Sequence, residues 1–515
     1  MIPSQRRVLE KPASVTVELT RQCNVKCIHC YSSAGIGGFN PSSRVLKSIL
    51  HKALDVEPFY LIFTGGEPFV RADLPDLMLT VYERTGQQMP EITIATNGQL
   101  ISSERGEKVL DTASKINDLV GYPVIGIYVS LHGSTPEIHD RIMASSGAYT
   151  RAVKGIEMIK ERGNIAFGVG CTPLRINYDD LDNIVNRALE LGSPVLNFSQ
   201  FVPTGRGAYA KEIDLTPEQY QNFVQWFVQR REELEEKILL VTHEPLEVMV
   251  YPVVSELEQY YGCPAAWLSA TIEPDGTVYP CPLSPIAAGN VSETSLMDIW
   301  LNSAVFKQFR DRDNFSGVCG SCDLKWVCGG CRGTSLAYEN TAFGSDRRCW
   351  HYTSDGKERI GRINVVSNKT GKDLLTENIQ KLLNRNVEDE LLRKPLRQNS
   401  DGMIIKNLEK SISSNIKETL GNYLVFRPPN PNRWNYSTTL HVLDRITRAT
   451  VELDSQAGRI YLDIGFNGIS IDKLLLKYPR TEWENILSLI YKMAKANILL
   501  LKRTNETDMM FASVS

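Results

Sequence analysis

The sequence lacks the features of several large classes of protein. Its longest apolar run near the C-terminus, residues 498–501, is far too short to span a bilayer, and residues 1–15 contain no apolar core long enough for a signal peptide. Lys and Arg number 57 against 60 Asp and Glu, so the net charge of -3 indicates no polycationic surface. We therefore expect neither nucleic-acid nor membrane partners.

Cysteine is the residue type whose distribution is unusual. The chain has 11 cysteines, an odd number, and all but one fall into tight groups among Gly, Pro and aromatic residues. In a reducing compartment such groups are more often metal ligands than disulfides. The sequence therefore favours a cytoplasmic metal-binding protein, with Cys171 as the cysteine outside the groups.

Between residues 14 and 203, short apolar runs alternate with amphipathic helical patterns such as 42–55 and 149–163. The predicted strands are 15–20, 60–66, 91–98, 124–133, 164–172 and 194–203. Alternating strands and helices indicate crossover units and a parallel sheet. The pattern predicts an α/β fold, a partial (β/α)6 barrel whose strand C-termini carry the chemistry, as they do in full barrels.

At 515 residues the chain is too long for one compact core, and typical domain sizes suggest about three or four domains. We expect the barrel over 1–215, a helical bridge over 216–261, a Cys-rich domain over 262–352, a polar linker with one helix over 353–420 and a small α+β domain over 421–515. Thr216 and Pro217 predict the start of a helix over 216–240.

The first cysteine group follows directly on the first predicted strand. Cys23, Cys27 and Cys30 have the spacing C-x3-C-x2-C, which places three thiolates in one loop at a strand's C-terminal end. Three thiolates are one short of the usual four-ligand site for structural zinc or an iron–sulfur cluster. Either a distant fourth ligand completes a zinc site, or a cubane cluster keeps one iron open for a substrate or cofactor.

The motif TGGEP at residues 64–68 follows the next predicted strand. Gly65 and Gly66 have no Cβ, so backbone can approach a ligand closely there, while Glu67 and the exposed backbone groups can receive an ammonium. Together with the cysteine loop, the motif describes an amino-acid site beside an open iron and argues against zinc.

The cysteine loop and the GGEP motif, followed by ATNG at 95–98 and VSLHG at 129–133, resemble the radical S-adenosylmethionine (SAM) enzymes. In that family a [4Fe-4S] cluster with one open iron binds the amine and carboxylate of SAM and donates one electron. The product is a 5′-deoxyadenosyl radical, which abstracts hydrogen from the substrate. The resemblance implies that the cluster is held by Cys23, Cys27 and Cys30. It implies that the methionyl amine is bound by Gly65, Gly66, Glu67 and Pro68, and that the nucleoside or carboxylate is contacted by Asn97 and Ser130.

The sequence departs from the family pattern at two positions. His29 stands where the family usually has an aromatic residue near the adenine, a contact that imidazole can also make. The segment HDRIM at 139–143 has Met143 where the family pattern HD-x-x-R has an arginine. Arg141 is then the candidate partner for the SAM carboxylate.

A second cysteine group comprises Cys263, Cys281, Cys319, Cys322, Cys328, Cys331 and Cys349. Because CxxC pairs hold a metal from one loop, the group predicts a four-cysteine cluster with a three-cysteine cluster, or a zinc site and a remnant. The order, with its C-x12-G-x4-C opening, resembles the SPASM extension of radical SAM enzymes. The resemblance implies an outer auxiliary cluster held by Cys319, Cys322, Cys328 and Cys349, and an inner one held by Cys263, Cys281 and Cys331.

The inner set is one cysteine short. Anaerobic sulfatase-maturating relatives have a further cysteine just before the position of Cys263, and none lies here between Cys171 and Cys263. The inner cluster would then have an open iron that holds a substrate thiolate or carboxylate, a ligand other than cysteine, or fewer irons; a structural or electron-relay cluster is the alternative. Those relatives also have an acid where this chain has Pro282, and Asp275 is only a nearby turn residue, so no general base is carried over.

Cys171 ends the fifth predicted strand, near the place where the radical would form. Radical epimerases need a thiol to return a hydrogen atom, which makes Cys171 a candidate hydrogen donor. A buried free cysteine is, however, a common small apolar filler, and we favour that interpretation.

The last domain combines short strands with helical patterns over 469–479 and 481–501. This plan resembles the RiPP recognition element, a small winged-helix module that binds the leader segments of ribosomally made peptides. The resemblance implies that a leader peptide adds a strand to the sheet edge of this domain. A generic winged helix or a dimerisation module is the alternative.

These features predict a radical SAM/SPASM enzyme that modifies a ribosomally synthesised peptide or protein side chain by oxidation, cross-linking or excision. The expected cofactors are SAM, one [4Fe-4S] cluster and two auxiliary iron–sulfur clusters. The expected partners are a leader-bearing substrate and a flavodoxin- or ferredoxin-type reductant. The alternatives are an enzyme that acts on a small-molecule cofactor precursor, a peptide epimerase, and an iron–sulfur electron carrier. The GGEP motif argues against the carrier, which needs no amino-acid pocket.

Overall fold

The computed structural model describes residues 8–350, apart from gaps at 122, 235–236, 243 and 251–261. Beyond residue 350 it describes short strands and a few residues between 474 and 489. The chain divides into two compact units, of which the first takes in nearly all of residues 1–374 and the second residues 375–515. The predicted linker over 353–420 lies outside the described residues.

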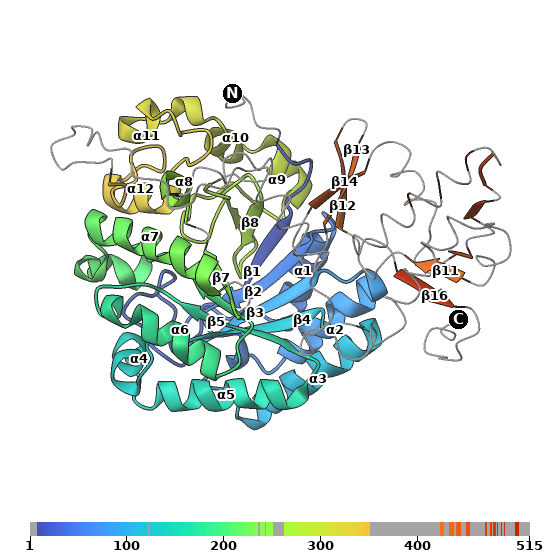
Figure 1. Ribbon diagram of the computed structural model, residues 1–515, viewed down its shortest axis with the longest axis horizontal. Helices are drawn as coiled ribbons and strands as arrows, with labels where there is room; N and C mark the ends of the chain where they lie inside the picture. The colour runs from blue at the N-terminus through green and yellow to red at the C-terminus, as the bar shows by residue number, and fades with distance from the viewer. Residues whose placement is uncertain are drawn as a thin grey trace. The chain divides into compact units, whose positions relative to one another are not determined.

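The first unit is built on a ten-stranded sheet in the order β10-β9-β8-β1-β2-β3-β4-β5-β6-β7. Its parallel core consists of β1 (Ser14–Thr20), β2 (Tyr60–Gly65), β3 (Glu91–Thr96), β4 (Ile125–Ser130), β5 (Ala166–Cys171), β6 (Val195–Phe198) and β7 (Leu239–Thr242). The intervening helices lie outside the sheet (Figure 1): α1 (Ser43–Leu54), α2 (Leu74–Thr85), α3 (Glu104–Val120), α4 (Pro136–Met143), α5 (Ala148–Arg162) and α6 (Leu181–Glu190). The predicted α/β fold with a partial barrel is confirmed.

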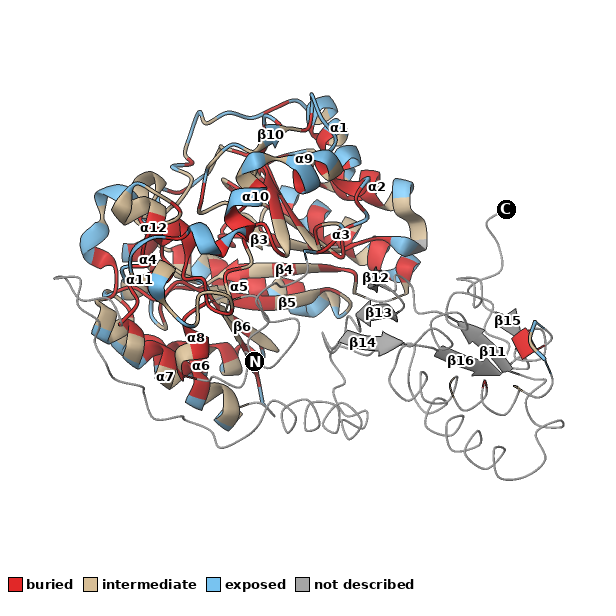
Figure 2. Ribbon diagram, turned by 90° about the horizontal axis from the view of Figure 1, so that it is seen from above, coloured by how far each residue is buried: buried red, intermediate tan, exposed pale blue. Residues whose placement is uncertain are grey.

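The core strands bury one face and leave the other half-buried. In β3, Ile92, Ile94 and Thr96 are buried and the residues between them are not, and β2, β4 and β6 alternate in the same way. Successive side chains of a strand point to opposite faces, so the buried set packs beneath the helices and the other set lines the concave side. Figure 2 shows the buried residues gathered along these strands and the inner sides of the helices. A Cβ on Gly170 would meet no atom within 4 Å, so the concave side has open space near the strand ends.

Local sequence explains where the helices begin and end. The Oγ of Ser42 accepts a hydrogen bond from Val45 N at 3.4 Å and caps the start of α1. Helix α5 lies between Gly147 and Gly163, whose φ angles of 71° and 72° belong to the left-handed region that glycine adopts without strain.

Helix α7 (Pro217–Leu234) is shorter than predicted, because residues 239–242 form β7 instead of continuing the helix. In the sequence, the apolar residues from Ile238 onward extend the helical pattern of α7. Their pairing with β6, in which Leu239 lies opposite Val195, overrides that local pattern. The parallel core therefore has one strand more than the sequence predicted.

The Cys-rich region continues the same sheet. Strand β8 (Ser269–Ile272) pairs in parallel with β1, and β9 (Thr277–Tyr279) and β10 (Gly289–Asn290) follow in antiparallel order. Helix α8 (Glu247–Val250) precedes this region. The region's own short helices are α9 (Leu296–Asn302), α10 (Ala304–Arg310), α11 (Gly317–Ser321) and α12 (Arg332–Glu339). The barrel and the Cys-rich region thus share one hydrogen-bonded sheet.

The second unit contains two small antiparallel sheets. One has the order β15 (Ile469–Ser470), β11 (Tyr423–Phe426), β16 (Leu500–Arg503), and the other β12 (Asn432–Tyr436), β13 (Thr439–Leu443), β14 (Thr450–Leu453). Strands β15 and β16 occupy the first and last residues of the segments predicted as helices. The winged-helix domain stays a prediction. No helix in the described part of the chain is long and apolar enough to cross a membrane.

Candidate functional site

The loop after β1 carries Cys23, Cys27 and Cys30, all half-buried free thiols. Cys23 N donates a hydrogen bond to Gly35 O at 3.2 Å, and Cys30 N donates to Cys27 O at 3.3 Å, so the loop is folded back on itself. Burial raises the pKa of Cys23 to about 11 and that of Cys27 to about 12. Thiolates in this loop therefore need a bound cation, and the irons of a cluster would supply it.

Arg206, in the loop after β6, holds the cysteine loop from outside. Its Nε donates to Cys27 O at 2.8 Å and its Nη1 to Ala34 O at 3.1 Å. The neighbouring Gly207 N donates to Cys30 O at 3.2 Å. The sequence did not single out Arg206, because its partners are backbone carbonyls far away along the chain and leave no local pattern.

Gly65 and Gly66 pack directly against the backbone that leads into the cysteine loop. Gly66 N donates to Thr20 O at 2.6 Å, and Glu67 N donates to Gln22 O at 2.8 Å. A Cβ on Gly66 would lie 1.9 Å from Gln22 O, and one on Gly65 would lie 2.5 Å from Thr20 O. Only glycine fits at these two positions, so the motif and the cysteine loop are fixed together.

Glu67 joins the ends of β2 and β3. Its Oε1 accepts hydrogen bonds from Thr96 Oγ1 at 2.7 Å and from Phe69 N at 3.0 Å, where it caps the 3-10 turn Pro68–Val70. Its Oε2 accepts from Asn97 N at 2.7 Å. Burial raises the pKa of this carboxyl to about 7. The carboxylate thereby brings the GGEP and ATNG segments side by side.

Asn97 and Ser130 lie at the same end of the sheet as the cysteine loop. Asn97 Nδ2 donates to Asn24 Oδ1 at 2.8 Å and lies 3.9 Å from Cys23 Sγ. Ser130 ends β4 and pairs with Gly170 on the concave side. The structure thus gathers the residues expected to contact SAM, and their individual roles stay predictions.

Met143 supports the cysteine loop by apolar packing. Its Sδ lies 3.5 Å from Cys27 Sγ, and its side chain packs with Val25 and Ala148. Arg141 is exposed on α4. At the position where the family pattern has an arginine, this chain therefore has a buried thioether, and a contact from Arg141 to the SAM carboxylate stays a prediction.

His29 belongs to a row of three imidazoles, of which His132 and His139 are buried and His29 is half-buried. The ring centroids of His29 and His132 are 4.5 Å apart, and those of His132 and His139 are 6.0 Å apart. Thr172 N donates to His132 Nδ1 and His132 N donates to His139 Nδ1, so neutral forms of these two rings carry their proton on Nε2. Burial lowers the pKa of His29 and of His139 to about 4. The row is therefore uncharged at neutral pH.

Cys171 is buried among the side chains beneath the helices. It pairs in register with Phe198, whose ring packs edge-on against Phe227 of α7 at 6.0 Å between centroids. Asn177 Nδ2 lies 3.7 Å from the Cys171 sulfur, and burial raises the pKa of the thiol. This placement on the outer side of the sheet supports the filler interpretation, and the hydrogen-donor role stays an untested prediction.

The remaining cysteines are free thiols that form two spatial sets. Burial raises the pKa of Cys328, and its neighbours Cys349, Cys319 and Cys322 raise it further. Burial likewise raises the pKa of Cys281, with contributions from Cys263 and Cys331. The structure thus brings together the two sets predicted for the outer and inner clusters. No three His, Cys, Asp or Glu side chains in the described part form a site for one metal ion, whereas in a multi-iron cluster each thiolate binds its own iron.

Hydrogen-bond donors surround the outer set. Three amide nitrogens each lie 3.4 Å from a sulfur: Leu324 from Cys322, Gly330 from Cys328 and Asp346 from Cys319. The buried Arg332 also places Nη2 3.4 Å from the sulfur of Cys319. Hydrogen bonds to sulfur tune the potential of an iron–sulfur cluster, so this set of donors fits such a group.

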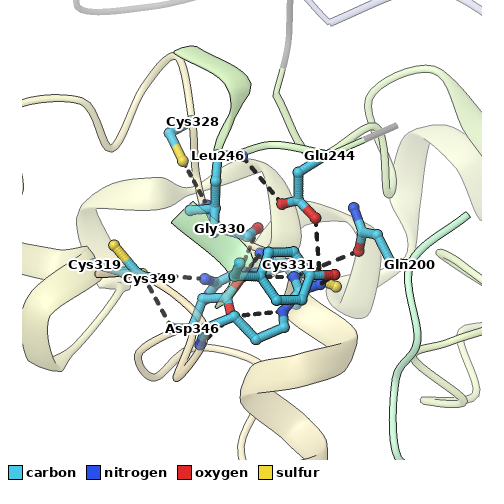
Figure 3. A network of polar contacts seen from close by, with 12 residues as sticks. Gln200, Glu244, Leu246, Cys319, Cys328, Gly330, Cys331, Asp346 and Cys349 are labelled. Carbon is cyan, nitrogen blue, oxygen red and sulfur yellow. Dashed lines mark hydrogen bonds and ion pairs between the residues drawn. The ribbon is translucent and has the colours of Figure 1, made fainter. Parts of the chain in front are cut away.

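Arg348 is the centre of a buried polar network beside the inner set, and Figure 3 shows its partners Glu244 and Asp346 near Cys331. Its guanidinium donates to Asp346 at 2.8 and 3.1 Å and to Tyr220 OH at 2.6 Å, and it lies 3.4 Å from Glu244. Asp346 Oδ2 also accepts from Cys331 N at 2.7 Å. Burial raises the pKa of Glu244 to about 7. The network links α7 and the segment after β7 to a cysteine of the inner set, and no sequence motif signalled it.

Comparison with known proteins identifies both cysteine regions. The model of the radical SAM superfamily matches residues 17–188, and the model of the SPASM iron–sulfur cluster-binding domain matches residues 263–323. AdoMet-dependent heme synthase of Methanosarcina barkeri is 28% identical over 346 residues, which are 63% of this chain and 93% of the relative. Mycofactocin maturase MftC of Mycolicibacterium smegmatis is 26% identical over 370 residues, 70% of this chain and 89% of the relative. The subtilosin biosynthesis protein AlbA of Bacillus subtilis is 25% identical over 329 residues, 61% of this chain and 68% of the relative.

Solved structures share the fold. SuiB of Streptococcus suis, bound to S-adenosylmethionine, superposes with a TM-score of 0.54 at 19% identity over 67% of this chain and 78% of SuiB. SuiB bound to its precursor peptide SuiA gives the same TM-score. The enzyme anSMEcpe with bound AdoMet gives 0.52 at 18% identity over 66% of this chain and 94% of that one. The match to the radical SAM model and the similarity to the heme synthase and to MftC set aside the electron-carrier alternative. The chain carries a radical SAM domain followed by a SPASM iron–sulfur domain and is a SAM-dependent enzyme.

Proposed function

We propose that the protein is a maturase that modifies a side chain of a ribosomally synthesised peptide or protein through a 5′-deoxyadenosyl radical. The similarity to MftC and AlbA, together with the fold shared with SuiB, whose structure holds a precursor peptide, carries the proposal. The modification is an oxidation, a cross-link or an excision.

The residues at the strand ends have separate tasks in this proposal. Cys23, Cys27 and Cys30 hold the [4Fe-4S] cluster, which supplies the electron for SAM cleavage when bound, and residues 65–68 hold the methionyl amine. Arg206 and Met143 keep the cysteine loop in place through the contacts described above. The concave side of the sheet receives the substrate residue and keeps water from the reacting atoms.

The Cys-rich region holds two auxiliary clusters in this proposal. Cys319, Cys322, Cys328 and Cys349 enclose the outer cluster, and Cys263, Cys281 and Cys331 hold the inner one. The inner set supplies three thiolates where a complete [4Fe-4S] cluster uses four, so one iron has a ligand other than cysteine or is available to the substrate.

The second unit binds the leader segment of the substrate. Its described strands form two three-stranded sheets, each with two edge strands to which an extended peptide can add. A flavodoxin- or ferredoxin-type protein supplies electrons, and the free state of all 11 cysteines suits the reducing cytoplasm.

A second candidate function is the modification of a small-molecule cofactor precursor. The observation that favours it is the similarity to AdoMet-dependent heme synthase, whose length is matched over 93%. In this case the second unit has a structural role and binds no leader peptide.

One experiment separates the two candidates. The anaerobically reconstituted full-length protein is incubated with SAM, dithionite and the peptides encoded beside its gene, and deoxyadenosine and peptide masses are measured. A peptide-dependent rise in deoxyadenosine with a mass change such as the loss of two hydrogens supports the maturase. The same peptide without its leader should react much more weakly. Deoxyadenosine formation that no peptide stimulates argues for the small-molecule enzyme, and no deoxyadenosine at all contradicts both.

A further inference from the structure

A cleft of about 320 Å³ lies outside the cysteine loops and has no role in the proposal above. The residues that matter in its lining are Arg175, Lys211, Asp214, Tyr338, Arg347 and Arg348. Arg175 follows β5 and Lys211 follows β6, so the cleft opens on the loops at the C-terminal ends of these strands. Tyr338 lies on α12, and the cleft is thus formed where the barrel meets the SPASM domain.

Positive charge dominates this lining. Arg175, Lys211 and Arg347 are exposed, while Arg348 is buried and held by Asp346 and Glu244. The cleft concentrates these cations although the whole chain carries a net charge of -3. Such a concentration attracts anions, and guanidinium groups bind carboxylates with two parallel hydrogen bonds.

Tyr338 contacts two of the cations and the buried acid Asp214. Lys211 Nζ lies 5.1 Å from the centroid of the Tyr338 ring and donates to Ala337 O at 3.2 Å, and the guanidinium of Arg347 lies 6.0 Å from the same ring. Tyr338 OH donates to Asp214 Oδ2 at 2.8 Å. Asp214 Oδ1 has no hydrogen-bond partner among the described residues, although the side chain is only 4% exposed. The Tyr338 ring therefore contacts both Lys211 and Arg347, while its hydroxyl group binds the buried acid.

The start of α7 adds to the positive potential. Thr216 and Pro217 at this helix N-terminus line the cleft, and Thr216 forms reciprocal bonds with Gln219 at 3.0 and 3.1 Å. The helix is 18 residues long, and the N-terminal end of a helix carries partial positive charge. The cations and the helix end act on the same space.

We propose that this cleft binds carboxylate groups of the substrate and so anchors an acidic substrate between the barrel and the SPASM domain. The inference rests on the proposed function, because it assigns a recognition site to that enzyme's substrate. Arg175 and Lys211 contact the carboxylates, and Arg347 lines the entrance. Arg348 connects the floor of the cleft, through Asp346, to the backbone of Cys331. An anchored substrate would therefore lie close to the inner cysteine set.

Two sources can provide the carboxylates: acidic residues of a peptide, or a small molecule with several carboxyl groups. The first probe is a fluorescein-labelled peptide with two adjacent glutamates, compared with a peptide in which glutamines replace them. The second probe is unlabelled glutarate as a competitor. Fluorescence anisotropy with the reconstituted full-length protein reports binding of both, and it is independent of SAM cleavage.

Matched charge variants test the location. The double variant Arg175→Gln/Lys211→Gln removes two cations from the cleft. The control Lys52→Gln/Lys307→Gln removes two exposed cations elsewhere and changes the net charge equally. We expect the cleft variant to bind the diglutamate peptide about tenfold more weakly and the control to stay within about twofold, since each lost charge-assisted contact weakens affinity and general attraction is equal. Asp214→Asn removes the acid from the floor and should strengthen binding by about two- to fivefold.

The outcomes distinguish this inference from the function on which it rests. Binding that the cleft variant loses and the control keeps supports the site, whether or not the preparation cleaves SAM. Competition by glutarate then favours a small polycarboxylate, and its absence favours an acidic peptide. Equal losses in both double variants, or equal binding of the glutamate and glutamine peptides, would overturn the inference even in an enzyme that cleaves SAM and modifies a peptide.

Discussion

The two cysteine regions differ in how far their thiols are exposed and in which groups hold them. The loop after β1 leaves all three of its cysteines half-exposed and ties them to the protein through backbone contacts with Arg206 and the GGEP glycines. In the SPASM domain, most cysteines are buried, and the buried Arg332 and Arg348 stand behind them. The first region leaves its three thiols partly accessible, and the second buries most of its thiols.

The difference shows in which atoms are held in place. In the first region the contacts hold the backbone and leave the thiols open to one side. In the second, N–H groups point at the sulfurs, as Gly330 N does toward Cys328 at 3.4 Å. A site that must exchange its cofactor needs a fixed frame with a free face, whereas a site that stores or relays electrons needs a fixed environment on all sides.

The largest effect is expected from removal of the three cysteines in the loop after β1. Replacing Cys23, Cys27 and Cys30 together by alanine should abolish deoxyadenosine formation and lower the iron content by about four atoms per chain, since one [4Fe-4S] cluster is lost. Iron analysis and chromatography of the reaction products measure both. Cys171→Ala is the control and should keep the iron and the SAM cleavage. Unchanged iron content in the triple variant would contradict the assignment.

In the SPASM domain, we expect a substitution behind the cysteines to lower the free energy of unfolding. Arg348→Gln leaves Asp346 and Glu244 buried without their cation, which should cost about 3–5 kcal/mol of unfolding free energy. Arg84→Gln removes an exposed ion pair with Asp55 and should cost only about 0–1 kcal/mol. Denaturant unfolding under anaerobic conditions compares the two. Similar losses in both variants would mean that the network around Arg348 does not support the SPASM domain.

The connection between the GGEP motif and the cysteine loop can be tested with one methyl group. Gly66→Ala would place Cβ 1.9 Å from Gln22 O, so the loop must shift, and SAM cleavage should fall about 10- to 100-fold because the reacting groups lose their alignment. Gly35→Ala adds the same group where no atom lies within 4 Å, and it should stay within about twofold. Deoxyadenosine formation in the absence of substrate is the measurement. Equal activity of the two variants would show that the close packing at Gly66 is not needed.

The smallest effect concerns Asp214, which lies where the two regions meet. Burial raises the pKa of this carboxyl from 3.8 to about 6, so the folded state favours the protonated form and loses stability as the pH rises through 6. Between pH 5.5 and 7.5 this group should lower the wild-type stability by about 1 kcal/mol, a loss that Asp214→Asn lacks. Denaturant unfolding at both pH values tests the difference. A parallel pH dependence of the two proteins would mean that the carboxyl titrates normally.

The sequence predicted the barrel well because its signals are local. The strands β1 to β6 are short apolar runs bounded by turn residues, α1 begins at the cap residue Ser42, and α5 ends at Gly163. The sequence extended the predicted helix over 216–240 into the start of β7, because the choice between helix and strand there depends on pairing with β6, which lies far away in the sequence.

The cysteine ligands were visible in the sequence, but the residues that hold them were not. The resemblance to the SPASM extension assigned its seven cysteines to two sets, and the structure brings the members of each set together. Arg206 contacts backbone carbonyls of the cysteine loop, and Arg348 contacts Glu244 and Tyr220. All of these partners lie far away in the sequence, where each arginine is an ordinary one in a polar stretch. The basic cleft depends in the same way on Arg175, Lys211 and Tyr338, which only the fold brings together.

The pairing of β8 with β1 has a consequence for whether the barrel can be separated from the SPASM domain. Strand β8 belongs to the SPASM domain, and it covers the edge that β1 would otherwise present to solvent. A gene shortened to end before residue 262 would encode a barrel with an uncovered parallel strand, which invites aggregation with other chains. We therefore expect the barrel and the SPASM domain to fold together as one chain, unlike domains that are joined by a flexible linker.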